Sequence, residues 1–143
     1  MRKSLFHGIA GSVTSPAGFV AAGVFCDIKR LGTGKGSHKP LKRDLALLVS
    51  QTPATVAGVF TTNQVCAAPV KLCIERVRPG LARAVVVNSG NANACTGHRG
   101  QLDAEEMAQL AAAALNIPAA EVLVASTGRI GVPMPLEIVR KGI

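Results

Sequence analysis

The sequence has no Trp and no Tyr, and it has only four Phe among 143 residues. Single-stranded nucleic acids are commonly held by stacking bases on aromatic side chains, so this scarcity argues against that class of binding. Charged residues make up only 17% and hydrophobic residues 48%, which excludes intrinsic disorder. We therefore expect a globular chain with a core built mainly from small aliphatic side chains.

Long hydrophobic runs are also absent. No apolar stretch approaches the roughly 20 residues needed to span a bilayer. The segment Ser4–Val13 is interrupted by polar residues and glycines, unlike the apolar part of a signal peptide. We expect a cytoplasmic protein that does not associate with membranes.

Closely paired cysteines are missing as well. Cys26, Cys66, Cys73 and Cys95 are far apart and lie in apolar surroundings, which indicates free thiols in a reducing compartment. Cys95 and His98 have a ligand-like spacing, but there is no second pair of that kind. We predict no metal site and no cofactor.

Positive charge is in excess: 16 Lys and Arg against 8 Asp and Glu give a net charge of +8. Such a field attracts anions, so a small basic nucleic-acid-binding module remains a less favoured alternative. Many of the cations lie between Lys29 and Arg43, in a glycine-rich stretch. Its Gly-Lys is not followed directly by Ser or Thr, and Pro40 prevents the helix that a phosphate-binding loop requires.

The order of apolar runs and helix signals along the chain predicts a succession of strands and helices. Short apolar runs rich in β-branched residues predict strands, with Pro53 separating a possible hairpin pair. Pro69 opens one helical segment that ends near Val77, and Asp103 with Glu106 predicts the capping box of a longer helix. No repeat or linker is visible, so residues 1–143 form a single α/β unit. The predicted strands are Phe19–Phe25, Leu45–Ser50, Thr55–Thr61, Ala84–Val87 and Val122–Ala125.

Two polar segments follow predicted strands, where ligands commonly bind in α/β proteins. The first contains Asn88, Asn91 and Asn93, and the residues alone favour neither a ligand site nor an ordinary turn. The second is Ser126-Thr127-Gly128, whose hydroxyls and glycine N–H can donate to an oxyanion. A plain Ser/Thr turn explains that segment somewhat better when only its residue types are considered.

At these segments the chain resembles the ornithine acetyltransferases, or bifunctional glutamate N-acetyltransferases. The resemblance runs through nearly the whole chain. Its most specific stretches are AVVVNSGNANACTG (Ala84–Gly97) and VLVASTGRIG (Val122–Gly131), and it includes VTSPAGFVAAG (Val13–Gly23) and PATVAGVFTTNQV (Pro53–Val65). It implies an α/β fold, a layered sheet-and-helix sandwich of the ornithine acetyltransferase type that is incomplete in this chain.

The resemblance also implies a function. Members cleave themselves and free a threonine at the start of a β chain; this threonine moves acetyl from N-acetylornithine to glutamate in arginine biosynthesis through an acyl-enzyme. It implies that Thr127 and Gly128 form the oxyanion hole, and that acetyl-CoA is a possible co-substrate. It suggests an α2β2 assembly.

Three departures accompany the resemblance, and one is that the family's substrate-binding threonine and lysine, which precede its cleavage point, are missing. The family's nucleophile follows a cleavage point beyond Ile143, so we expect these 143 residues alone to be inactive. Arg129 replaces a small apolar residue and could bind a carboxylate or point to solvent. Asn88, Asn91, Asn93 and Arg129 are our weaker candidates for the substrate pocket. A non-catalytic remnant or subunit is the alternative function.

Overall fold

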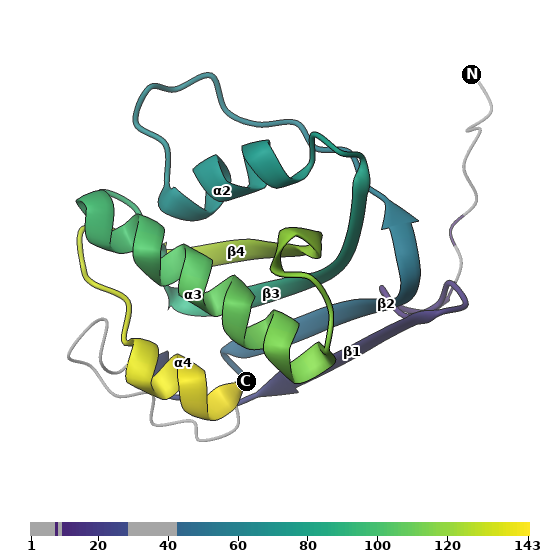
Figure 1. Ribbon diagram of the computed structural model, residues 1–143. Coiled ribbons are helices and arrows are strands. Elements are labelled where there is room, and N and C mark those ends of the chain that lie inside the picture. Colours follow the sequence, from purple (N-terminus) through teal and green to yellow (C-terminus); the bar gives the residue numbers. More distant parts are fainter. Residues whose placement is uncertain (1–7, 9, 29–42) are drawn as a thin grey trace, which may run out of the picture.

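A computed structural model describes residue 8 and residues 10–28 and 43–143, and Figure 1 shows their arrangement. Four strands form one sheet in the order β1-β2-β3-β4. The pairs β1–β2 and β2–β3 are antiparallel, whereas β3 and β4 are parallel. The carboxyl ends of β3 and β4 therefore lie side by side. The strands are β1 (Phe19–Val24), β2 (Leu45–Thr55), β3 (Leu81–Asn91) and β4 (Val122–Arg129).

One face of this sheet is covered by helices that come from the second half of the chain (Figure 1). The longest, α3, connects the two parallel strands, as a parallel pair requires. Among the described residues, none of the helices is both long and apolar enough to cross a bilayer. The helices are α2 (Ala68–Arg76), α3 (Gly97–Leu115), the short 3-10 helix η1 (Ala119–Glu121) and α4 (Leu136–Gly142).

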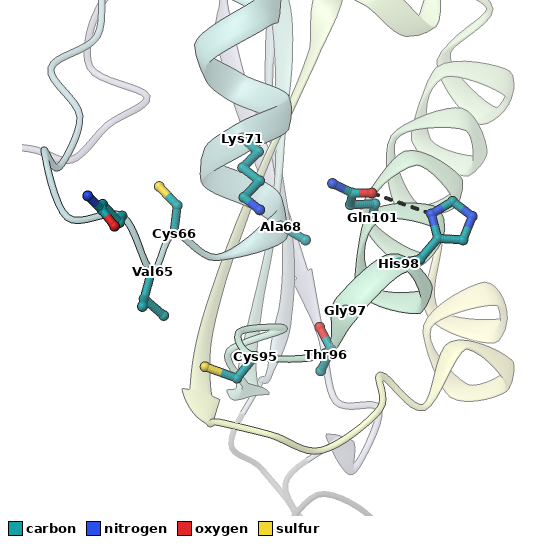
Figure 2. Close-up of a pocket in the computed structure, with 10 residues that line it drawn as sticks. Val65, Cys66, Ala68, Lys71, Cys95, Thr96, Gly97, His98 and Gln101 are labelled. Atoms are coloured by element: carbon teal, nitrogen blue, oxygen red, sulfur yellow. Dashed lines mark hydrogen bonds between the residues drawn. The ribbon is translucent and has the colours of Figure 1, made fainter.

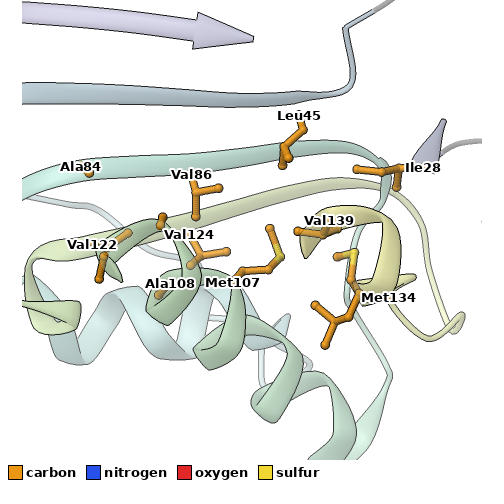
Figure 3. Packing of buried hydrophobic residues seen from close by; sticks show 13 residues of the cluster. Ile28, Leu45, Ala84, Val86, Met107, Ala108, Val122, Val124, Met134 and Val139 are labelled. Carbon is orange, nitrogen blue, oxygen red and sulfur yellow. The ribbon is translucent and has the colours of Figure 1, made fainter. Parts of the chain in front are cut away.

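The core lies between the sheet and α3 and α4. Side chains alternate along a strand, so Val86 of β3 and Val124 of β4 point toward the helices, where Met107 of α3 fills the space between them (Figure 3). Val139 of α4 closes the end of this layer and is 0% exposed. The alanines of α3, among them Ala108, let the helix pack closely against the strands.

Helix α2 lies along the outer edge of β4. The Cys73 thiol donates to the carbonyl oxygen of Val124 at 3.3 Å, and Arg76 Nη1 donates to that of Val122 at 2.5 Å. Burial lowers the pKa of Arg76, opposed by nearby Cys73 and glutamates. These side chains cover an edge whose backbone groups would otherwise offer a pairing template to another strand.

The opposite face of the sheet is apolar and is only partly buried by the described residues. Leu48 of β2, Val85 and Val87 of β3 and Leu123 of β4 alternate with the core residues and therefore point away from α3. A face of this composition normally packs against another layer of protein.

Two strand predictions need correction. The strand predicted from Leu45 to Ser50 continues to Thr55, and no separate strand follows at Thr55–Thr61. Instead of forming a hairpin with that segment, β2 pairs with β1 and β3. The register shifts between Val49 and Ala54, and such an irregularity allows Pro53 within a strand. The predicted basic loop Lys29–Arg43 lies almost wholly outside the described residues.

The start of the longest helix was also predicted wrongly. Helix α3 begins at Gly97, so Asp103 is an interior residue and not a cap. Its carboxylate is buried and accepts a hydrogen bond from Arg99 Nε at 2.7 Å. The short helix α4 was not predicted. The helix predicted at Pro69–Val77 is confirmed as α2, with proline in its first turn.

Candidate functional site

The two polar segments predicted as loops are the last residues of β3 and β4. The pairing continues through Asn88 with Ser126 and Gly90 with Gly128, and it ends at Asn91 with Arg129. The parallel register thus places the predicted oxyanion pair directly beside the asparagine segment. The sequence predicted both segments at strand ends but did not predict that they are hydrogen-bonded neighbours.

Two glycines make this contact possible. Gly128 has φ of +136°, and an added Cβ would lie 2.3 Å from the carbonyl carbon of Gly90. The same atom would lie 2.5 Å from the backbone nitrogen of Asn91. Both distances are far below van der Waals contact, and an L side chain rarely adopts that φ. Only glycine fits at position 128, so the end of β4 rests directly on the backbone of β3.

Thr127 and Gly128 are exposed, whereas Val122 and Val124 at the start of β4 are buried. Val122 and Val124 point into the core, so alternation along β4 places Thr127 on the opposite, apolar face of the sheet. Its hydroxyl is therefore accessible from that side, and Gly128 next to it is also exposed. Arg129, which follows them, is also exposed.

The three asparagines are all 0% exposed. Asn88 Nδ2 donates to the carbonyl oxygen of Asn91 at 2.8 Å. Asn93 Nδ2 donates to that of Gly100 at 2.8 Å, and Asn93 Oδ1 accepts from the Thr96 hydroxyl at 2.8 Å. Their amides thus hold the strand end and the start of α3 in place. A direct contact of any of them with substrate stays a prediction.

Asn91 makes the longest-range connection. Its Nδ2 donates to the carbonyl oxygens of both Val132 and Pro133 at 3.0 Å. Its Oδ1 accepts from the backbone N–H of Asn93 at 2.7 Å. All hydrogen-bonding groups of this amide are used, and two of its partners lie in the segment that follows Thr127 and Gly128.

A separate cleft of about 390 Å³ opens between the beginnings of α2 and α3 (Figure 2). Lys71 of α2 and His98 and Gln101 of α3 line it, and His98 Nδ1 lies 3.4 Å from Gln101 Oε1. Neither Thr127 nor Gly128 lines this cleft. The sequence did not single it out, because its walls come from two helix starts that are distant in the chain. The described residues contain no group of three or more His, Cys, Asp or Glu placed to bind a metal ion.

The sheet, its helices and the polar ends of β3 and β4 define a mixed α/β segment of the ornithine acetyltransferase type. Two crystal structures match it with a TM-score of 0.81. One is the arginine biosynthesis bifunctional protein ArgJ of Bacillus halodurans, 41% identical, covering 92% of this chain and 64% of that chain. The other is the ornithine acetyltransferase of Mycobacterium tuberculosis in complex with ornithine, 45% identical, covering 91% of this chain and 66% of that chain.

Residues 21–143 match the model of the ArgJ family, and the chain belongs to that family. The arginine biosynthesis bifunctional protein ArgJ of Symbiobacterium thermophilum is 56% identical over 135 residues. That alignment covers 94% of this chain and 32% of the relative. The chain spans about a third of the length of the curated relatives it matches. The predicted family and fold class are confirmed.

Proposed function

We propose that this chain forms the N-terminal part of an acetyltransferase of arginine biosynthesis. The complete enzyme moves acetyl from N-acetylornithine to glutamate through a threonine acyl-enzyme. Membership of the ArgJ family supports this assignment, as does the structural match to an ornithine acetyltransferase that was crystallised with ornithine. Acetyl-CoA is a second possible donor, and no cofactor is required for either transfer.

In this proposal Thr127 and Gly128 supply the oxyanion hole. Attack on an acetyl group produces a tetrahedral intermediate with a negative oxygen, which preorganised hydrogen-bond donors stabilise. The Thr127 hydroxyl and the Gly128 N–H are the two donors. The observation that carries the assignment is their exposure at the end of β4, where Gly128 packs closely against the backbone of Gly90.

The nucleophilic threonine comes from a β chain that the complete enzyme releases by self-cleavage. Thr127 lies on the apolar face of the sheet, so the β chain approaches from that side and covers Leu48, Val85 and Leu123. Two such pairs make an α2β2 assembly. The 143-residue chain alone lacks a nucleophile in this proposal and does not turn over.

The test completes the chain with the remaining part of its S. thermophilum relative and measures acetyl transfer from N-acetylornithine to glutamate. We expect Thr127→Ala to lower kcat by about 10²–10³, because one preorganised donor is lost from the transition state. KM should change little, since the charge on the oxygen is absent from the ground state. Thr127→Ser keeps the hydroxyl and should retain most activity.

The matched control is Thr52→Ala, which removes an exposed threonine from β2. It should leave kcat and melting temperature unchanged. A folded Thr127→Ala enzyme with normal kcat would refute the oxyanion assignment. Absence of transfer by the completed, folded and self-cleaved enzyme, with either N-acetylornithine or acetyl-CoA as donor, would favour a non-catalytic subunit instead.

A further inference from the structure

The segment that follows the oxyanion pair is tied to the end of β3 by four hydrogen bonds. Two connect backbones: Ala92 N–H donates to the Arg129 carbonyl at 2.9 Å, and Gly131 N–H donates to the Ala94 carbonyl at 2.8 Å. The other two come from the single amide of Asn91. We call these four bonds the strand-end clamp. Half of it thus depends on one buried side chain.

The clamp holds the residues that directly follow Gly128, from Arg129 to Pro133. The ladder of β3 and β4 runs through Gly128 to Arg129, and the clamp holds the chain beyond that point. Gly128 also rests on the backbone nitrogen of Asn91. The chain after it includes Gly131 with φ of +74°, and glycines leave the backbone more conformations than other residues do. Without the two hydrogen bonds from Asn91, only the two backbone bonds of the clamp fix the conformation of this segment.

We propose that Asn91 is the positioning residue of the oxyanion hole, acting through Val132 and Pro133 and not through contact with substrate. The inference rests on the proposed function, because it assumes that Thr127 and Gly128 stabilise the oxyanion. Donors accelerate the reaction when they are fixed before charge develops, and small displacements of them are costly. The burial and full hydrogen bonding of the Asn91 amide suit this role.

The first variant is Asn91→Ser in the completed enzyme. The serine hydroxyl can still accept the local bond from Asn93 N–H, but it is too short to bridge to both carbonyls. We expect kcat to fall by roughly 10- to 100-fold, as for a displaced reacting group. KM should stay within about twofold. Asn91→Asp has the same shape but turns a carboxylate toward two carbonyl oxygens, so its kcat should fall at least as far.

A double-mutant cycle separates positioning from general destabilisation. If Asn91 positions both donors, its effect on kcat should be smaller when Thr127→Ala is already present, because only the Gly128 N–H then remains to be positioned. Asp103→Asn is the matched control. It replaces a carboxylate by an amide, the reverse of Asn91→Asp, at another buried side chain, in α3. It should lower the melting temperature and leave kcat unchanged at temperatures where the enzyme is folded.

Hydrogen exchange supplies a readout that does not need activity. Asn91→Ser should speed exchange of the peptide containing Gly131, whose N–H belongs to the clamp. Unchanged exchange, normal kcat in the folded variant, or effects that multiply independently with Thr127→Ala would each overturn the positioning role. So would a variant that is unfolded at the assay temperature. Failure of the proposed function has a different signature: normal kcat in Thr127→Ala, whatever Asn91→Ser does to exchange.

Discussion

Replacing Gly128 by alanine is the most direct test of the contact between β3 and β4. The added Cβ would lie 2.3 Å from the Gly90 carbonyl carbon and 2.7 Å from its oxygen. Both obstacles are backbone atoms, so they cannot move aside as a flexible side chain can. The residue would also keep a φ of +136°, which an L side chain rarely adopts.

Each of these two effects has a typical cost. A sparsely populated backbone conformation costs about 1–3 kcal/mol. Overpacking in a well-packed site costs about 1–3 kcal/mol more. Together they should lower the free energy of unfolding by about 2–6 kcal/mol. For a chain of this length, 1 kcal/mol corresponds to roughly 3–4 °C in melting temperature.

Gly131→Ala separates the two effects. Gly131 also has a positive φ, at +74°, but no heavy atom lies within 4 Å of its added Cβ. Only the conformational penalty applies, about 1–2 kcal/mol. The assay is denaturant unfolding of both variants beside the unsubstituted chain, with the slopes compared to confirm the same transition. If Gly128→Ala lowers the free energy of unfolding no more than Gly131→Ala does, the inferred steric contact between the ends of β3 and β4 is refuted.

Two further predictions concern the core and the dependence of stability on pH. Met107→Ala should lower the free energy of unfolding by about 2–5 kcal/mol because the side chain is fully buried, whereas Met107→Leu should cost less than about 1.5 kcal/mol; urea titration compares them. Burial, with a smaller contribution from Asp44, raises the pKa of the Cys26 thiol. The unfolded chain therefore loses this proton at lower pH, so stability should be constant below about pH 8 and fall above it. In Cys26→Ala this part of the decline should disappear when the free energy of unfolding is measured against pH. Identical pH profiles for both chains would contradict the prediction.

The sequence predicted where the strands begin better than where they end. Leu45 and Val122 start continuous apolar runs, and both positions are confirmed as strand starts. The residues from Asn88 onward were predicted as a loop because Asn and Gly are uncommon in strands. They are nevertheless part of β3, because their backbone groups pair with the backbone of β4. The closeness of the two polar segments follows from the parallel register, which local patterns do not specify.

The start of α3 was missed for a related reason. Gly97, His98 and Gly100 are poor or indifferent helix formers, so local preference placed the start later. The fold compensates through packing: a Cβ on Gly100 would lie 1.9 Å from the Thr96 hydroxyl oxygen and 2.5 Å from Asn93 Oδ1. The glycine lets the first turn of the helix fit against the asparagine segment. Tertiary contact overrides local propensity at this position.

The asparagines show why composition alone could not assign the site. An amide that binds a ligand and an amide that holds the backbone have the same residue type, and only burial and partners distinguish them. Here Asn91 and Asn93 use their amides within the protein, while Thr127 keeps its hydroxyl on the exposed face. A hole that stabilises developing charge needs both: donors open to the substrate and a rigid, fully hydrogen-bonded framework behind them. In our proposal Asn91 and Asn93, whose amides bond within the protein, supply that framework behind Thr127 and Gly128.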